Sequence, residues 1–331
     1  MRRLFVSIAL LVCVALALAV APALAQDDPT GITAAVVNPN ALVNAENFVG
    51  QISPMTYDIV AHTLTVGFSI MLAALFYFVL TIRGVAPRFR LSSILSVVVM
   101  VSAFLILYFQ AQSWQNSFTF DAAAGSYVLA PGADAFSNGF RYLNWLIDVP
   151  MLLFQILFIV DITRQRRASL RNQFWFSGTG MIVTGYIGQF YEAQTQSLTS
   201  PFFIWGLIST LFFVHVLYLI YRVIQEGKAG MSERAASVFG SIWPLFLVSW
   251  MLYPGGYLMP VLFNTEGILG GGIITEAGIV GRALTYTVAD VASKVIYGVL
   301  LTQVAQIRSR DMGYDSDLDT QMTESAPAKV S

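Results

Sequence analysis

Long apolar runs alternate with shorter polar stretches along most of this chain. Seven runs of mainly apolar residues cover 55–82, 91–113, 138–161, 172–192, 201–224, 236–262 and 277–307. A helix of about 20 apolar residues crosses the hydrocarbon core of a bilayer, which is about 30 Å thick. The pattern therefore predicts an all-α membrane protein in which seven transmembrane helices form one bundle over residues 55–308.

The composition supports a membrane protein and excludes other classes. Of the 331 residues, 56% are hydrophobic and only 11% are charged, and the formal net charge is −1. A soluble domain carries about 25% charged residues, and a nucleic-acid-binding domain has a basic surface. We therefore expect membrane lipid around this chain and no nucleic-acid partner.

The two ends of the chain differ from the bundle. Residues 1–25 combine two early arginines, an apolar stretch and a final Ala-Leu-Ala, which is typical of a cleavable signal peptide; a first membrane helix is the alternative. Cleavage there would remove Cys13, the only cysteine, and with it disulfides and thiolate chemistry. Residues 26–54 predict an extracellular segment with a short helix around 41–48, and the polar residues 309–331 predict a disordered cytoplasmic tail.

Basic residues indicate the orientation of the bundle. Arginine or lysine follows the first, third, fifth and seventh runs, whereas the loops 114–137, 193–200 and 263–276 contain neither. Positively charged loops stay on the cytoplasmic side. The sequence thus predicts an N-terminus outside and a cytoplasmic C-terminus, and the signal peptide independently predicts the same external N-terminus.

Ionisable side chains inside apolar runs are functional candidates, because a charge within a membrane is costly. In the third run, Arg141, Asn144, Asp148 and Gln155 fall within about 60° of arc on a helix with 3.6 residues per turn. They form one polar stripe along roughly 20 Å of helix, since each residue adds about 1.5 Å. A stripe at several depths favours a conduction path over a single binding pocket.

The seventh run contains Asp290 and Lys294, which are four residues apart and so share one helix face. A lysine amine in a low-dielectric interior is driven towards its neutral, nucleophilic form, which condenses with aldehydes. The resulting protonated Schiff base is a buried cation that needs counter-charge, for which Asp148 and Asp290 are the candidates. A buried salt bridge that only fixes the helix register is the alternative interpretation.

Three segments resemble the microbial (type 1) rhodopsins, a family of seven-helix retinal proteins. Residues 141–150 (RYLNWLIDVP) resemble the family's third helix, and residues 250–254 (WMLYP) resemble its sixth. Residues 290–294 (DVASK) resemble its retinal-binding seventh helix.

The resemblance extends to one branch of that family. Asn144, Asp148 and Gln155 resemble the Asn-Asp-Gln signature of the light-driven sodium pumps, and residues 171–178 and 185–192 are also similar to that branch. This implies a light-driven ion transporter, not an enzyme, that exports sodium and moves protons when sodium is absent. An outward proton pump and a photosensory rhodopsin are the alternatives. The implied location is the bacterial cytoplasmic (inner) membrane, as a multi-pass protein.

The resemblance also implies a role for each candidate residue. All-trans retinal is implied as a cofactor bound covalently to Lys294, with Asp148 and Asp290 as proton acceptor and counterion. Asn144 offers a carbonyl oxygen without a titratable charge, so we expect it to form, with Asp290, a transient hard-oxygen site for the transported sodium ion. The other implied sites are a gate (Arg141, Glu192, Arg282), a cytoplasmic path (Ser93, Ser96, Ser102, Gln155, Ser293) and a retinal pocket (Trp145, Gly185, Trp250, Tyr253, Pro254). A structural ion-pair network that caps the bundle is the alternative for the gate.

Assembly is implied by the resemblance alone. Tyr57, Thr119 and Asp134 resemble an external cation site between subunits of this branch, which implies a homo-oligomer, namely a pentamer. Gly185 leaves room for a carotenoid antenna near the ring end of retinal.

Overall fold

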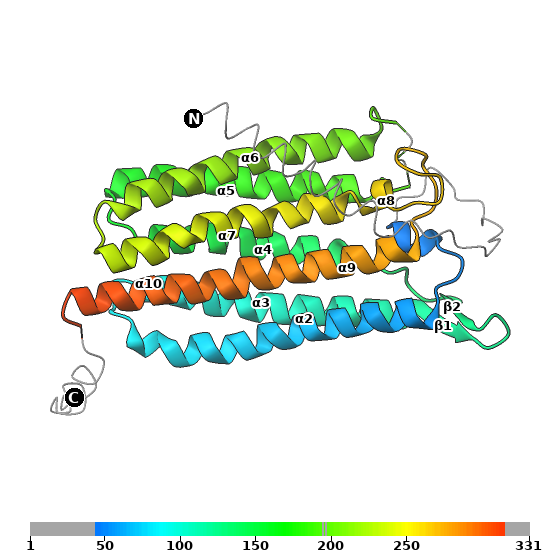
Figure 1. The fold of residues 1–331 in the computed structure, drawn as a ribbon, viewed down its shortest axis with the longest axis horizontal. Helices are drawn as coiled ribbons and strands as arrows, with labels where there is room; N and C mark the ends of the chain where they lie inside the picture. The colour runs from blue at the N-terminus through cyan, green and yellow to red at the C-terminus, as the bar shows by residue number, and fades with distance from the viewer. Residues whose placement is uncertain (1–43, 194, 196, 315–331) are drawn as a thin grey trace, which may run out of the picture.

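The computed structural model describes residues 44–193, 195 and 197–314 of the 331-residue chain. The expected signal peptide, most of the N-terminal segment and most of the tail lie outside the described residues. Long helices dominate and lie side by side (Figure 1): α2 Pro54–Thr81, α3 Arg90–Ser117, α4 Gly139–Leu157, α5 Arg164–Gln189, α6 Pro201–Lys228 and α7 Glu233–Tyr257. The last long helix consists of α9 Glu276–Asp290, a π-helical segment Val291–Ile296 and α10 Tyr297–Asp311. Short 3₁₀ turns occupy Ala45–Phe48 and Ile82–Gly84.

The long helices form a closed ring. From α2 to α7 each packs against the next along the chain, α7 packs on α9, and α9 returns to α2. With α9, the π-helical segment and α10 counted as one helix, the described chain is the expected all-α bundle of seven helices.

Helix starts coincide with side chains that cap free backbone N–H groups. The Ser53 hydroxyl accepts a hydrogen bond from the Thr56 N–H (3.2 Å), and Thr275 does the same for Gly278 (3.3 Å). Pro54 occupies the first helical position, where a missing N–H costs nothing. These signals explain why α2 and α9 begin within one residue of the boundaries expected from hydropathy.

In the described chain, five helical segments are long and apolar enough to cross a membrane: Pro54–Gly84, Arg90–Ser117, Pro201–Lys228, Glu233–Tyr257 and Glu276–Asp311. The other two long helices, α4 and α5, are more polar for different reasons. The polar stripe runs along α4, and arginines fill the first turns of α5.

Two expected boundaries are wrong by more than a turn. α4 ends at Leu157 rather than 161, and α5 begins at Arg164 rather than 172. The Thr163 hydroxyl caps the Arg166 N–H, so arginines that were expected in a loop extend from the first turns of a helix. The sixth run also divides, into α7 and the short helix α8 Met259–Leu262.

A β-hairpin that was not expected lies in the loop after α3. Strands β1 Phe118–Asp121 and β2 Ser126–Leu129 pair antiparallel, with Phe118 opposite Leu129. Aromatic and β-branched residues favour strands, and Gly125 has a φ of +64° in the turn between them. The hairpin and α8 lie at one end of the bundle, and the end of α10 lies at the other (Figure 1).

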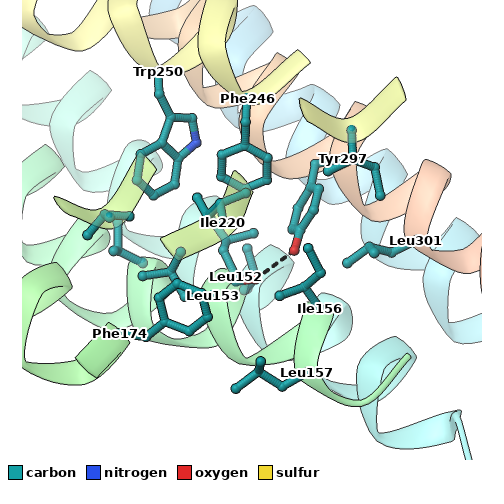
Figure 2. Close-up of a cluster of buried hydrophobic side chains, with 14 of the residues drawn as sticks. Leu152, Leu153, Ile156, Leu157, Phe174, Ile220, Phe246, Trp250, Tyr297 and Leu301 are labelled. Carbon is teal, nitrogen blue, oxygen red and sulfur yellow. Dashed lines mark hydrogen bonds between the residues drawn. The ribbon is translucent and has the colours of Figure 1, made fainter. Parts of the chain in front are cut away.

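A layer of buried apolar side chains fills the interior on the α10 side of the bundle. Figure 2 shows its members Leu152, Leu153, Ile156, Leu157, Phe174, Ile220, Phe246, Trp250, Tyr297 and Leu301, all at most 2% exposed. They come from α4, α5, α6, α7 and α10. The Tyr297 hydroxyl donates to the Leu152 carbonyl at 2.8 Å, which joins α10 to α4 within this apolar layer.

Candidate functional site

Lys294 lies inside the ring, in the π-helical segment that joins α9 to α10, and its side chain is 1% exposed. Its Nζ is 2.5 Å from Asn144 Oδ1 and 2.7 Å from Asp290 Oδ1. Asp148 Oδ2 lies 3.5 Å from the same nitrogen. The polar stripe of α4 and the charged face of the last helix therefore meet at one nitrogen atom.

Asp290 is surrounded by hydrogen-bond donors. Its Oδ1 accepts from Trp145 Nε1 (3.0 Å), the Tyr253 hydroxyl (3.0 Å) and Lys294, and its Oδ2 pairs with Arg141 Nη1 (2.7 Å). Hydrogen bonds to a carboxylate favour its ionised form. Asp290 is thus a fixed negative charge beside Lys294.

Asp148 has a different environment although it is equally buried. Neither of its carboxyl oxygens has a hydrogen-bond partner in the described chain. The four buried charges of Arg141, Lys294, Asp148 and Asp290 sum to zero. Because Arg141 is paired with Asp290, Asp148 is the carboxylate that balances the charge at Lys294.

Arg141, which was expected at the gate, makes its ion pair in the central cluster, and it also lines a small cavity with Arg282 and Glu46. Its charged contact is the ion pair with Asp290, and its Nη2 donates to Thr287 Oγ1 at 3.1 Å. Thr287 and Asp290 are three residues apart on one face of α9, so a single guanidinium reaches both. Thr287 was not among the sequence candidates, although its spacing from Asp290 was the available signal.

The other two expected gate residues form a separate buried cluster. Arg282 Nη1 pairs with Glu192 Oε1 (2.7 Å), and Arg282 Nη2 pairs with Glu46 Oε2 (2.8 Å). The Ala45 N–H donates to Glu192 Oε2 at 2.8 Å, so the turn Ala45–Phe48 closes over this pair. Burial raises the pKa of Glu192, the Arg282 guanidinium opposes that shift, and the Glu46 carboxylate adds to it.

The expected cytoplasmic path divides into two groups. Ser102 accepts a hydrogen bond from Asn144 Nδ2 (3.3 Å) and Ser293 bonds to the Tyr253 hydroxyl (2.8 Å), so both belong to the central cluster. The second group, Ser93, Ser96 and Gln155, is buried, with each residue at most 2% exposed. Both amide atoms of Gln155 and the hydroxyl of Ser93 lack partners in the described chain.

A cavity of about 300 Å³ adjoins Lys294 between α4, α5, α6 and α7. All five expected pocket residues line it, namely Trp145, Gly185, Trp250, Tyr253 and Pro254. The rings of Trp145 and Tyr253 meet edge to face, with centroids 4.8 Å apart.

Gly185 permits close helix packing at this cavity. A Cβ there would lie 3.2 Å from Tyr142 Cε1 and 3.3 Å from Ser209 Oγ. A larger residue at position 185 would therefore press on Tyr142 and Ser209.

Tyr57, Thr119 and Asp134 lie at the hairpin end of the bundle. The Tyr57 ring stacks on Tyr127 with centroids 3.7 Å apart, and Thr119 pairs with Val128 across the hairpin. Thr119 and Asp134 are exposed. These contacts do not join the three residues within one chain.

A family model for bacteriorhodopsin-like proteins matches residues 58–307, which include the whole Lys294 cluster. The chain belongs to the bacteriorhodopsin-like family. Rhodopsins of this family bind retinal covalently, as a Schiff base on a lysine.

Individual rhodopsins are similar over different shares of the chain. Archaerhodopsin-1 of Halorubrum ezzemoulense is 26% identical over 293 residues, which are 88% of this chain and 94% of that protein. Blue-light absorbing proteorhodopsin of Gamma-proteobacterium Hot 75m4 is 27% identical over 169 residues, so this chain spans only 60% of that protein's length. The crystallographic structure of xanthorhodopsin, a light-driven ion pump with dual chromophore, aligns with a TM-score of 0.70 at 27% identity and covers 80% of this chain and 99% of that one.

The residues around the cavity fit retinal. A polyene needs an apolar slot with flat walls, which Trp145, Trp250 and Tyr253 provide. An aldehyde needs an amine at the end of the slot, and Lys294 lines the cavity. A cation at that nitrogen needs counter-charge, which Asp148 and Asp290 supply.

Proposed function

We propose that this rhodopsin is a light-driven pump that moves sodium ions outward across the membrane. The observation that carries the proposal is the set of groups at Lys294. A neutral amide lies at 2.5 Å, a fully hydrogen-bonded carboxylate at 2.7 Å and a second carboxylate without hydrogen bonds at 3.5 Å. In this set, the carboxylate without hydrogen bonds is suited to accept a proton, whereas the amide and the other carboxylate are suited to bind a cation.

Asp148 is the group that holds the proton. Bound retinal would supply light absorption and a light-dependent change in proton affinity at the Lys294 nitrogen. Asp148 Oδ2 is 3.5 Å from that nitrogen and has free lone pairs, whereas the lone pairs of Asp290 are engaged by Trp145, Tyr253 and Arg141. The proton therefore moves from the Lys294 nitrogen to the Asp148 carboxylate, and both groups become neutral.

Proton transfer opens the way for the ion. A sodium ion about 5 Å from a cationic nitrogen is repelled by about 3 kcal/mol at an effective dielectric constant near 20. That repulsion disappears once Asp148 holds the proton. Asn144 Oδ1 and Asp290 Oδ1, which both lose Lys294 as a hydrogen-bond donor at this stage, then offer hard oxygen ligands, which suit a small cation.

Gln155 determines which ion, sodium or the proton, undergoes net transport across the membrane. An amide has no acidic proton to deliver, so the proton returns to the Lys294 nitrogen from Asp148. The proton then only shuttles within the site, while sodium crosses the bundle. When sodium is absent, the same site moves protons.

The Arg282 cluster is the proposed exit gate. A cation that leaves the Lys294 site must pass two buried carboxylates, Glu46 and Glu192, that share one guanidinium. A cation there can replace Arg282 as the partner of either carboxylate. The alternative role is a structural cap, which the same ion pairs also support.

We further propose the setting in which the pump works. It lies in the bacterial cytoplasmic membrane with its N-terminus outside, as the arginine distribution favours. It forms a homo-oligomer, a pentamer, with an external cation site at Tyr57, Thr119 and Asp134, two of which are exposed at the hairpin end.

Bulk pH in illuminated cells tests the proposal. In sodium chloride, a sodium exporter raises external pH because protons flow in passively, and a protonophore enlarges the rise. In potassium chloride the sign reverses and the protonophore abolishes the signal. Acidification in both salts would contradict the proposal and indicate a proton pump, and a coloured protein without any signal would indicate a sensor. Cells that produce Lys294→Ala provide the colourless control.

A further inference from the structure

Buried polar atoms without partners lie between Lys294 and the far end of α10. They are the hydroxyls of Ser93 and Thr302 and both amide atoms of Gln155, and these residues are at most 2% exposed. They belong to α3, α10 and α4, and α3 packs on both of the others. Buried polar groups are normally satisfied by protein, water or ions. We refer to these three residues as the inner polar set.

The position of Thr302 gives the depth of this set. Thr302 follows Lys294 by eight residues and precedes Arg308 by six, so it lies about 12 Å from the first and about 9 Å from the second along the helix. The labelled residues of the apolar layer in Figure 2 come from α4 to α7 and α10, whereas Ser93 of α3 and Thr302 of α10 bring buried polar hydroxyls to this part of the bundle. For an ion that enters from the α10 end, the inner polar set would supply polar groups where α3 packs on α4 and α10.

Arg308 closes this end of the bundle. It is only 6% exposed, although it lies three residues before the end of α10. Its guanidinium donates to the Ile159 carbonyl and to the Asp161 carboxylate, and it lies over the Phe89 ring at 4.8 Å. Ile159 lies just beyond α4, where helix-end carbonyls lack intrahelical partners.

Asp161 connects this buried arginine to the surface. Its side chain is 38% exposed, and its two oxygens pair with different arginines, Arg308 through Oδ2 and Arg88 through Oδ1. Arg88 precedes α3 and is 55% exposed. One accessible carboxylate therefore holds two guanidinium groups from opposite parts of the sequence.

We propose that Asp161 binds the cation that enters at the α10 end of the bundle, which we call the mouth of the pump. Arg308 is the plug that this binding releases. The proposal rests on the proposed cation transport. At rest, the positive charge of Arg308 repels cations, and its planar group fills the space between Ile159 and Phe89. A cation at Asp161 competes with Arg308 for the carboxylate oxygens and so weakens the ion pair that keeps the Arg308 side chain in place. The mouth is therefore closed by default, which limits return of the transported ion.

Access of thiol reagents to position 302 tests the plug, whichever ion the protein transports. The retinal-loaded full chain carries Cys13→Ser and Thr302→Cys, and modification by a small cationic and a small neutral thiol reagent is timed. We expect Arg308→Gln to raise the rate with the cationic reagent at least tenfold. Arg310→Gln is the matched control, because it removes an exposed charge two residues away, and it should leave the rate unchanged.

Asp161→Asn distinguishes repulsion by the charge of Arg308 from steric blockage by its side chain. It also provides a test of the plug if Arg308→Gln fails to fold. It frees the guanidinium but keeps its charge, so the neutral reagent should gain access more than the cationic one. An unchanged absorption spectrum shows that the Lys294 site is intact in each variant. Equal cationic rates in Arg308→Gln and Arg310→Gln, or no gain of neutral access in Asp161→Asn, would overturn the plug.

The capture site is tested by the sodium dependence of light-driven transport. Asp161→Asn should raise the half-saturating sodium concentration at least fivefold and leave the rate at saturating sodium unchanged. An unchanged half-saturating concentration would overturn capture at Asp161. If the wild type moves only protons, the proposed function and sodium capture both fail, while the thiol rates still decide the role of Arg308.

Discussion

Replacing Asp148 by asparagine removes the carboxylate that pairs with Lys294 but has no hydrogen-bond partner in the described chain. The buried cluster then carries two positive and one negative charge. At 3.5 Å, the attraction between the Asp148 carboxylate and a cation at Lys294 is about 5 kcal/mol at an effective dielectric constant near 20. Leaving a buried charge without its partner costs about 3–5 kcal/mol of stability. We expect Asp148→Asn to lower the free energy of unfolding by about that amount.

The same change should abolish transport without preventing retinal binding. Lys294 remains, so the variant becomes coloured when retinal is added, but an amide cannot accept the proton. Sodium transport into vesicles under illumination and thermal loss of colour measure the two effects. Asp58→Asn is the matched control, because Asp58 is exposed and its loss should change neither. An Asp148→Asn protein that pumps at the wild-type rate would refute the role of Asp148.

Three further variants test other parts of the site. Lys294→Ala should give no visible absorption with retinal, whereas Lys228→Ala at the end of α6 should stay coloured; a coloured Lys294→Ala protein would exclude the Schiff base. Gln155→Leu should slow sodium transport about tenfold in vesicles at unchanged colour, because it removes the α4 member of the inner polar set; an unchanged rate would exclude Gln155 from the path. Burial raises the pKa of Glu192 above its ordinary 4.5, so the wild type should lose stability as pH rises from below 4.5 through the raised value, and Glu192→Gln should lack this dependence in colour-loss temperatures.

Helical periodicity was enough to predict which polar residues share a helix face. Asn144 and Asp148 are four residues apart, as are Asp290 and Lys294, so each pair must share a helix face. Two polar faces in an otherwise apolar bundle lower their energy by meeting, and the structure places both at Lys294 Nζ. The apolar runs likewise gave all seven helices, because each long helix needs a hydrophobic surface against lipid.

The contacts at the two ends of the bundle could not be predicted in the same way. Glu46 and Arg282 are far apart in sequence, and the residues around Glu46 are polar like any surface segment. Asp161 and Arg308 meet only because α4 and α10 end at the same level. The gate role of Arg141 is implied by the family resemblance, but which of several carboxylates it contacts depends on how α9 is rotated against α4.

Light-driven sodium flux into vesicles that contain only this protein and retinal tests the central claim most directly. The vesicles are loaded with a sodium indicator and a protonophore is present, so no proton gradient can drive exchange. For molecules inserted with the cytoplasmic side outward, we predict sodium accumulation in the light that stops in the dark, is absent in Lys294→Ala, and is enhanced by the protonophore. Sodium that stays at its dark level under illumination, with light-driven proton movement before the protonophore is added, would contradict the account.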